Sequence, residues 1–148
     1  MELSIGNLNE LQTKSISAQL KKCNEISGKF GLSLSKEDLE LMLQERKEVL
    51  ISTGRIEFGG GIVEKLVNTF CDSPYMNQEE YVDVLIELQE LFYLLKGETM
   101  EQLTDDELIS AMRLVFDYSG GSLDFLMGMD RGILYKIACT NSMEDVYE

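Results

Sequence analysis

Histidine is absent from the 148 residues of this chain. It is the side chain most often used as a general base near neutral pH and the commonest metal ligand in proteins. Its absence argues against most hydrolase and metalloenzyme mechanisms. Glu87 and Glu90 are spaced like half of a carboxylate-bridged metal site in a four-helix bundle, but such sites also place a histidine three residues after a glutamate. We therefore predict no catalytic residue, no cofactor and no metal site.

Cysteine is also scarce, and Cys23, Cys71 and Cys139 lie far apart in the sequence. There is no CxxC pair and the number is odd, so neither a zinc cage nor a closed disulfide framework fits. A nucleophilic thiol needs a nearby base or a helix N-terminus, whereas Cys71 precedes Asp72 and the other two have apolar neighbours. We expect three buried, unreactive thiols in a reducing cytoplasm.

Long hydrophobic runs are missing as well. No segment approaches the roughly 20 apolar residues that cross a bilayer, and the opening MELSIGNLNE lacks the basic and apolar regions of a secretory signal. We therefore expect a soluble cytoplasmic protein with no membrane partner.

Proline occurs once, whereas leucine, glutamate and methionine are abundant, a composition that favours helix over strand. The length suits one domain with a sizeable core. We predict an all-α fold: a single-domain bundle of five to seven helices over residues 1–148, with 139–148 as a frayed tail.

Apolar periodicity and capping residues place the individual helices. The second begins after Ser35 and ends at Gly54, and the third begins after three glycines and stops before Pro74. The fourth follows an Asn77 cap and is apolar around most of its circumference, which predicts a central position. The remaining predicted helices cover 9–27, a segment that follows the Thr104 cap, and 122–138, where two glycines can split the last one.

Residues 55–58, RIEF, predict a short extended segment at the end of the second helix. Its alternation points Ile56 and Phe58 into the core and turns Arg55 and Glu57 away from it.

Negative charge is concentrated in the later part of the chain. Seven basic and eight acidic side chains lie in residues 1–54, against six and nineteen in residues 55–148. Direct nucleic-acid binding is disfavoured because it depends on clustered lysine and arginine. A basic partner is compatible with this charge.

An acidic stripe runs along the predicted helix at 78–96. It consists of Glu80, Asp83, Glu87 and Glu90, at steps of three and four residues. Like charges at this spacing destabilise an isolated helix. We expect either a positive group nearby or a face that binds a partner.

A run of three glycines, Gly59, Gly60 and Gly61, precedes the third helix. Because a helix N-terminus attracts anions, these glycines together with Arg46 and Arg55 form a candidate site for a small anionic ligand. The run matches neither the dinucleotide-binding nor the P-loop motif. The alternative is a turn with positive φ angles that feeds a helix packed too closely for side chains.

Arg46 is a second irregularity, because it falls within the apolar stripe of the second helix. Its guanidinium must reach solvent or meet a carboxylate inside the fold. Arg46 and Arg55 are within reach of Glu57, Asp72 or the acidic stripe, and a buried ion-pair network is the expected result.

Three segments, TGRIEFGGGIVEKLVNTFCDSPYMNQEEYVDVLIELQELFYLLKGE, LTDDELISAMRLVFD and GSLDFL, resemble an uncharacterised family of small bacterial proteins, a domain of unknown function. The resemblance extends from about Leu39 to Met127. It implies a bacterial origin and a single helical domain, and it carries no activity, cofactor or catalytic residue.

These features favour a non-enzymatic protein–protein interaction or regulatory module with an acidic surface. The partner is a basic protein or a second copy of the chain. The first alternative is a small-anion-binding protein or enzyme with its site near the Gly59–Gly61 turn. The second is an acidic mimic of nucleic acid that occupies the basic groove of a DNA-binding protein.

Overall fold

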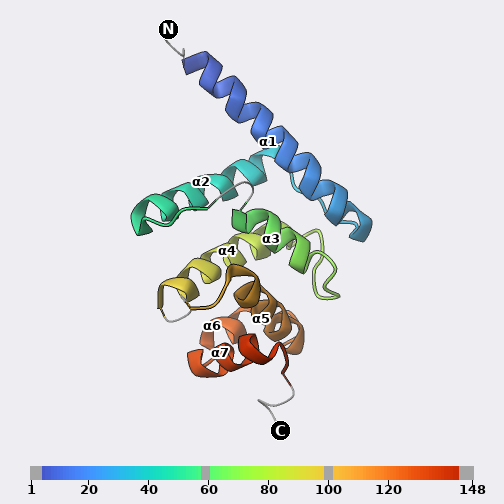
Figure 1. Ribbon diagram of the computed structural model, residues 1–148. Helices are drawn as coiled ribbons and strands as arrows, with labels where there is room; N and C mark the ends of the chain where they lie inside the picture. The colour runs from blue at the N-terminus through green and yellow to red at the C-terminus, as the bar shows by residue number, and fades with distance from the viewer. Residues whose placement is uncertain (1–4, 58–60, 99–101, 144–148) are drawn as a thin grey trace.

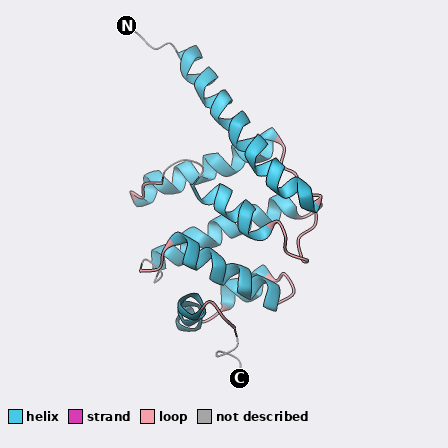
Figure 2. Cartoon of the chain, turned by 45° about the vertical axis from the view of Figure 1, so that its right-hand side comes forward, coloured by secondary structure: helices cyan, strands magenta, loops and turns pink. Residues whose placement is uncertain are grey.

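The computed structural model describes residues 5–57, 61–98 and 102–143, and the regular structure in these ranges is entirely helical (Figure 2). The helices are α1 (Ile5–Ser27), the 3-10 turn η1 (Gly28–Phe30), α2 (Lys36–Thr53), α3 (Gly61–Phe70), α4 (Tyr81–Glu98), α5 (Asp105–Tyr118), α6 (Leu123–Gly128) and α7 (Arg131–Thr140). The prediction of an all-α, single-domain fold is confirmed.

The helices are stacked in chain order between the two ends of the molecule (Figure 1). One row, the odd row, is made by contacts of α1 with α3, α3 with α5 and α5 with α7. A second, the even row, is made by contacts of α2 with α4 and α4 with α6. The rows are joined within the successive pairs α1–α2, α3–α4 and α5–α6. Stacked helix pairs of this kind are the arrangement found in α-solenoids.

Local sequence signals set several helix ends. The Ser35 hydroxyl accepts a hydrogen bond from Asp38 N, and the Asp38 carboxylate accepts one from Ser35 N, which is a complete capping box. Thr104 and Glu107 form the same pair at the start of α5. Gly54 ends α2 at a φ of 69°, in the left-handed region that favours glycine. The predicted positions of these caps are confirmed.

Two boundaries differ from the prediction. α1 already begins at Ile5 and not at residue 9. Asn77 accepts a hydrogen bond from Glu80 N at 3.0 Å, but residues 78–80 form a turn and α4 starts at Tyr81. For residues 122–138, where a split was left open, the structure has two helices, α6 and α7, because the Asp130 side chain accepts from Ile133 N and starts a new helix.

The core is almost wholly apolar and is continuous between the two rows. α4 contacts α2, α3 and α6, in agreement with its predicted central position. Its buried residues are Tyr81, Leu85, Leu88, Gln89, Leu91, Phe92, Leu95 and Lys96. Two of these are polar, and both lie on the side of α4 where the charged clusters described below are found.

Candidate functional site

A buried carboxylate, Glu57, joins α2 to the segment that follows it. Its side chain is 4% exposed. Glu57 Oε1 lies 2.9 Å from Arg46 Nε, and Oε2 lies 2.9 Å from Arg55 Nε. The Tyr93 hydroxyl of α4 donates to both oxygens, at 3.1 and 2.9 Å. Arg46 therefore meets a carboxylate inside the fold, as its place in an apolar stripe predicted.

The network continues to α5 through Arg55. Arg55 Nη2 lies 2.7 and 2.6 Å from the two carboxylate oxygens of Asp105. Lys96 Nζ lies 3.2 Å from Asp105 Oδ1 and also donates to the carbonyl of Leu103. The network thus holds together α2, α4, α5 and the segment at 55–57. The predicted contacts of the two arginines with Asp72 and the acidic stripe are not made, and Asp72 pairs with Arg113 on α5.

The charges of this network set the pKa values of its members. Burial favours the neutral form of Glu57, but hydrogen bonds from Arg55, Arg46 and Tyr93 outweigh it, and the pKa of Glu57 lies below its ordinary value. The pKa of Asp105 is lowered in the same way, against burial, by Arg55 and Lys96. Burial and the charge of Glu57 raise the pKa of Tyr93, so its hydroxyl remains a donor.

The orientation predicted for residues 55–58 is wrong where the structure describes it. Ile56 is 75% exposed, whereas the side chain of Glu57 is only 4% exposed. Two guanidinium groups and a phenol hold the carboxylate inside, and since neighbouring residues of an extended segment face opposite ways, Ile56 is turned outward. Phe58 lies outside the described residues.

Gly61, the first residue of α3, packs directly on this network. Its φ is +55°, and a Cβ there would lie 2.6 Å from Arg46 Nη2 and 2.7 Å from Glu57 Oε1. The next residue, Ile62, donates its N–H to Glu57 Oε1 at 3.5 Å. Gly61 therefore occupies a turn with a positive φ angle, which was the alternative to a binding site for an external anion. The anion beside the start of α3 is the protein's own Glu57. Gly59 and Gly60 lie outside the described residues.

An open hollow of about 530 Å³ lies beside the same network. It is lined by Leu43, Arg46, Lys47, Leu50, Ile51, Arg55 and Glu57. This is the place that the anionic-ligand alternative would use, although the guanidinium groups facing it already contact Glu57 and Asp105.

The acidic stripe of α4 is exposed. Glu80, Asp83, Glu87 and Glu90 all face solvent, and no ion pair in the part of the chain that the structure describes involves them. The charged groups that line the two hollows bordering this stripe are carboxylates, so the first of the two expectations, a positive group nearby, is not met there. We call these four residues, three from α4 and Glu80 from the turn that precedes it, the α4 acidic face.

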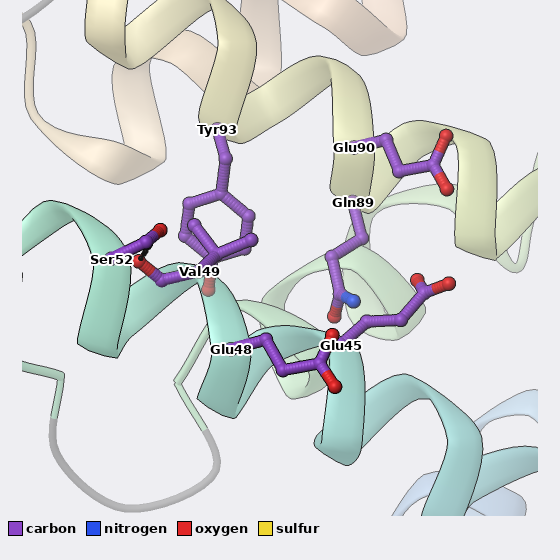
Figure 3. A pocket seen from close by; sticks show the side chains of 7 residues that line it. All are labelled: Glu45, Glu48, Val49, Ser52, Gln89, Glu90 and Tyr93. Atoms are coloured by element: carbon purple, nitrogen blue, oxygen red, sulfur yellow. Dashed lines mark hydrogen bonds between the residues drawn. The ribbon is translucent and has the colours of Figure 1, made fainter.

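One of these hollows, the α2–α4 pocket, lies between neighbouring helices of the even row and measures about 350 Å³ (Figure 3). α2 contributes Glu45, Glu48, Val49 and Ser52, and α4 contributes Gln89, Glu90 and Tyr93. Burial, followed by the charges of Glu90 and Glu48, raises the pKa of Glu45. The carboxylates of the pocket therefore repel one another, and this repulsion disfavours the ionised form of Glu45.

A second acidic hollow lies between α4 and α6 and measures about 410 Å³. Its carboxylates are Glu87, Glu90 and Asp124, and its apolar lining consists of Leu91, Leu94 and Met127. Glu90 borders both hollows. Acidic side chains thus form a continuous strip over α2, α4 and α6.

The thiols are not all buried. Burial raises the pKa of Cys23 to about 11, and burial followed by the charge of Asp72 raises the pKa of Cys71. Both are buried, as predicted, but Cys139 is exposed. It lies in the last turn of α7, where Ile137 and Ala138 occupy the inward face. The prediction for Cys139 is wrong because its apolar neighbours lie on another side of the helix.

Among the described residues, no group of three or more cysteine, aspartate or glutamate side chains has an arrangement that could hold a metal ion. In the same ranges, no helix has the length and apolar character to span a membrane.

Sequence reasoning missed Gln89, Glu45 and Glu48. Gln89 stands between Leu88 and Glu90, and nothing in the sequence marks it as buried. Glu45 and Glu48 are close to Arg46 in the sequence, but the predicted site was built around Arg46, which lies on another side of α2. Their grouping depends on the packing of α2 against α4, which no local pattern specifies.

The chain matches the model of a family of unknown function (DUF6323) over residues 19–141. The chain belongs to this family, so its predicted membership of a family of unknown function is confirmed, over a longer range than predicted, whereas the bacterial origin stays a prediction. No curated protein and no solved structure matches the chain.

Proposed function

For this member of a family of unknown function, we propose that the chain is a non-enzymatic cytoplasmic interaction module whose α4 acidic face binds a basic segment of another protein. The observation that carries the proposal is the exposed α4 acidic face, whose carboxylates form no ion pair with any described residue and which is bordered by two hollows. Stacked helical folds bind partners along rows of this kind. Complementary charge gives such contacts their specificity and a fast association rate.

The distribution of ion pairs supports this choice. Several carboxylates elsewhere are paired with cations, among them Asp72, Asp105 and Glu64, which contact Arg113, Arg55 and Lys22. In the ranges that the structure describes, the α4 acidic face has no such partners. Unpaired like charges on neighbouring helix turns cost stability, and a bound cationic segment would remove this cost.

Two alternatives have less support. A second copy of this chain would bring another net charge of −14 towards an acidic face. An anionic ligand near Arg46 and Arg55 would have to displace Glu57 or Asp105 from contacts of 2.6–2.9 Å. A nucleic-acid mimic is a special case of the proposal, in which the basic partner is a DNA-binding protein and DNA competes for it.

The test is the binding of a fluorescent ten-residue lysine-rich peptide, followed by anisotropy at several salt concentrations. Reversing Asp83 and Glu87 to lysine should weaken binding about tenfold at low salt, because each exposed pair contributes up to ~1 kcal/mol and reversal adds repulsion. The matched control reverses Glu25 and Glu37, two exposed acidic residues of α1 and α2 that lie outside the strip. Equal losses in the two double variants would reject the α4 acidic face as the binding surface.

A further inference from the structure

The α2–α4 pocket contains a buried amide oxygen that has no partner. Gln89 is 1% exposed, and its Nε2 donates to the carbonyl of Met42 at 3.1 Å. This hydrogen bond fixes the carboxamide, while Oε1 has no hydrogen-bond partner among the described residues. Figure 3 shows the carboxamide directed into the pocket, towards the side chains of Glu45 and Glu48. Buried polar atoms without a partner are rare in folded proteins, and a bound donor is one way to satisfy them.

The other polar groups of the pocket are also acceptors. Glu45 Oε2 is buried without a partner within the described ranges, and Glu48 Oε1 accepts one hydrogen bond from Gln44. The hydroxyl donors point elsewhere, because Ser52 donates to the carbonyl of Val49 and Tyr93 donates to Glu57. The pocket therefore presents oxygen acceptors and negative charge, and the donors of Ser52, Gln89 and Tyr93 are already used within the protein.

This chemistry selects an organic cation rich in N–H groups. A metal ion is disfavoured, because no carboxylate cluster with suitable geometry is present in the described residues. Val49 and the ring of Tyr93 provide apolar contact for an alkyl stem, and a volume of about 350 Å³ admits a long side chain. Lysine and arginine combine an apolar stem with a charged donor head.

We propose that the α2–α4 pocket receives one lysine or arginine side chain of the protein partner, whose N–H groups donate to Gln89 Oε1 and to the carboxylates of Glu45 and Glu48. The inference rests on the proposed function. It identifies a specific contact through which the acidic surface would distinguish its partner from other basic segments. Glu90 borders this pocket and the α4–α6 hollow, so a basic segment that crosses α4 can occupy both.

The first experiment tests the pocket without the rest of the partner. N-acetyl-lysine methylamide and its arginine counterpart are titrated into isotope-labelled protein, and the side-chain amide signals of Gln89 are followed by NMR. We expect saturable shifts of Gln89 and of the backbone amides of residues 48–52. The norleucine analogue, which keeps the stem and lacks the charge, should produce none. Equal shifts with norleucine, or no shift with either cationic probe, would overturn the proposal.

The second experiment uses the lysine-rich peptide with Gln89→Leu, a substitution that leaves the net charge unchanged. Its affinity should fall about fivefold through the loss of one buried acceptor for a charged donor. Glu48→Gln serves as a second variant, with Glu25→Gln as its charge-matched control. If Asp83 and Glu87 reversals weaken binding while Gln89→Leu and Glu48→Gln do not, the acidic face is the binding surface and the pocket assignment is wrong. If no variant affects binding, the proposed function fails as well.

Discussion

Replacing Glu57 by glutamine tests whether the buried network holds the fold together. The amide keeps the shape of the side chain but removes the charge shared by Arg46 and Arg55, whose side chains are only 14% and 22% exposed. Breaking a fully buried ion pair costs about 3–5 kcal/mol, because the remaining charge is left uncompensated. Arg55 keeps Asp105, and both arginines retain some contact with solvent, so we expect a loss of about 2–3 kcal/mol.

The measurement is urea unfolding at pH 7, followed by circular dichroism at 222 nm. For a domain of this size, the expected loss corresponds to a fall in Tm of roughly 5–10 °C. Glu98→Gln is the matched control, because it breaks a surface pair with Arg131 in which the glutamate is 41% exposed. Such pairs contribute at most ~1 kcal/mol. If Glu57→Gln destabilises the protein no more than this control, the network does not stabilise the fold in the way argued here.

The same variant has a defined pH dependence. The pKa of Glu57 in the folded protein lies below its unfolded value, so its contribution is complete above the unfolded pKa of about 4.3 and is lost as the pH falls through the folded pKa. The gap in unfolding free energy between wild type and Glu57→Gln should therefore be constant from pH 7 to pH 5 and shrink below about pH 4. Asp105 titrates in both proteins and cancels in the comparison. A gap that stays constant down to pH 2.5 would contradict the assignment.

Two further predictions concern Gly61 and the thiols. Gly61→Ala should lower the free energy of unfolding in urea by about 2–3 kcal/mol, because the residue has a φ of +55° and its new Cβ would overlap the ion pair of the network. Gly28→Ala is the control and should be close to neutral, because Gly28 has open space around it. A Gly61→Ala protein as stable as Gly28→Ala would show that the turn can relax. In the folded protein, Ellman's reagent should react rapidly with one thiol, Cys139, and Cys139→Ser should abolish that phase while Cys23 and Cys71 react only on unfolding. Rapid reaction of two or more thiols would contradict the burial described here.

Features that depend on interactions between residues close in sequence were predictable, and those that depend on distant segments were not. The caps at Ser35, Gly54 and Thr104 act within a few residues, and their positions are correct. Arg46 was recognisable because a charge in an apolar stripe needs a partner, and the partner was among the carboxylates considered. Which carboxylate it is could not be decided, because Glu57 becomes buried only when Tyr93 of α4 and both arginines meet around it.

The two-row stacking and the α2–α4 pocket could not be predicted from the sequence, because they also depend on contacts between distant segments. The contacts of α2 with α4 join residues more than 40 positions apart, such as Gln89 and Met42. Periodicity indicates which face of a helix is buried, but not which helix covers it. Gln89 therefore looks like an ordinary polar residue until the packing buries it.

The proposed interaction makes a separate prediction about the charge of the α2–α4 pocket. Pairs in the odd row, such as Lys65 with Asp106 and Arg113 with Asp72, show that the chain can position cations beside its carboxylates. In the α2–α4 pocket, burial and the charges of Glu90 and Glu48 raise the pKa of Glu45, and Gln89 Oε1 has no hydrogen-bond partner among the described residues. If stability alone governed this surface, a single lysine in place of Ser52 could relieve both defects, because its ammonium would reach the same carboxylates. Ser52→Lys should therefore stabilise the isolated protein while blocking the basic peptide, which separates the requirements of folding from those of the proposed interaction.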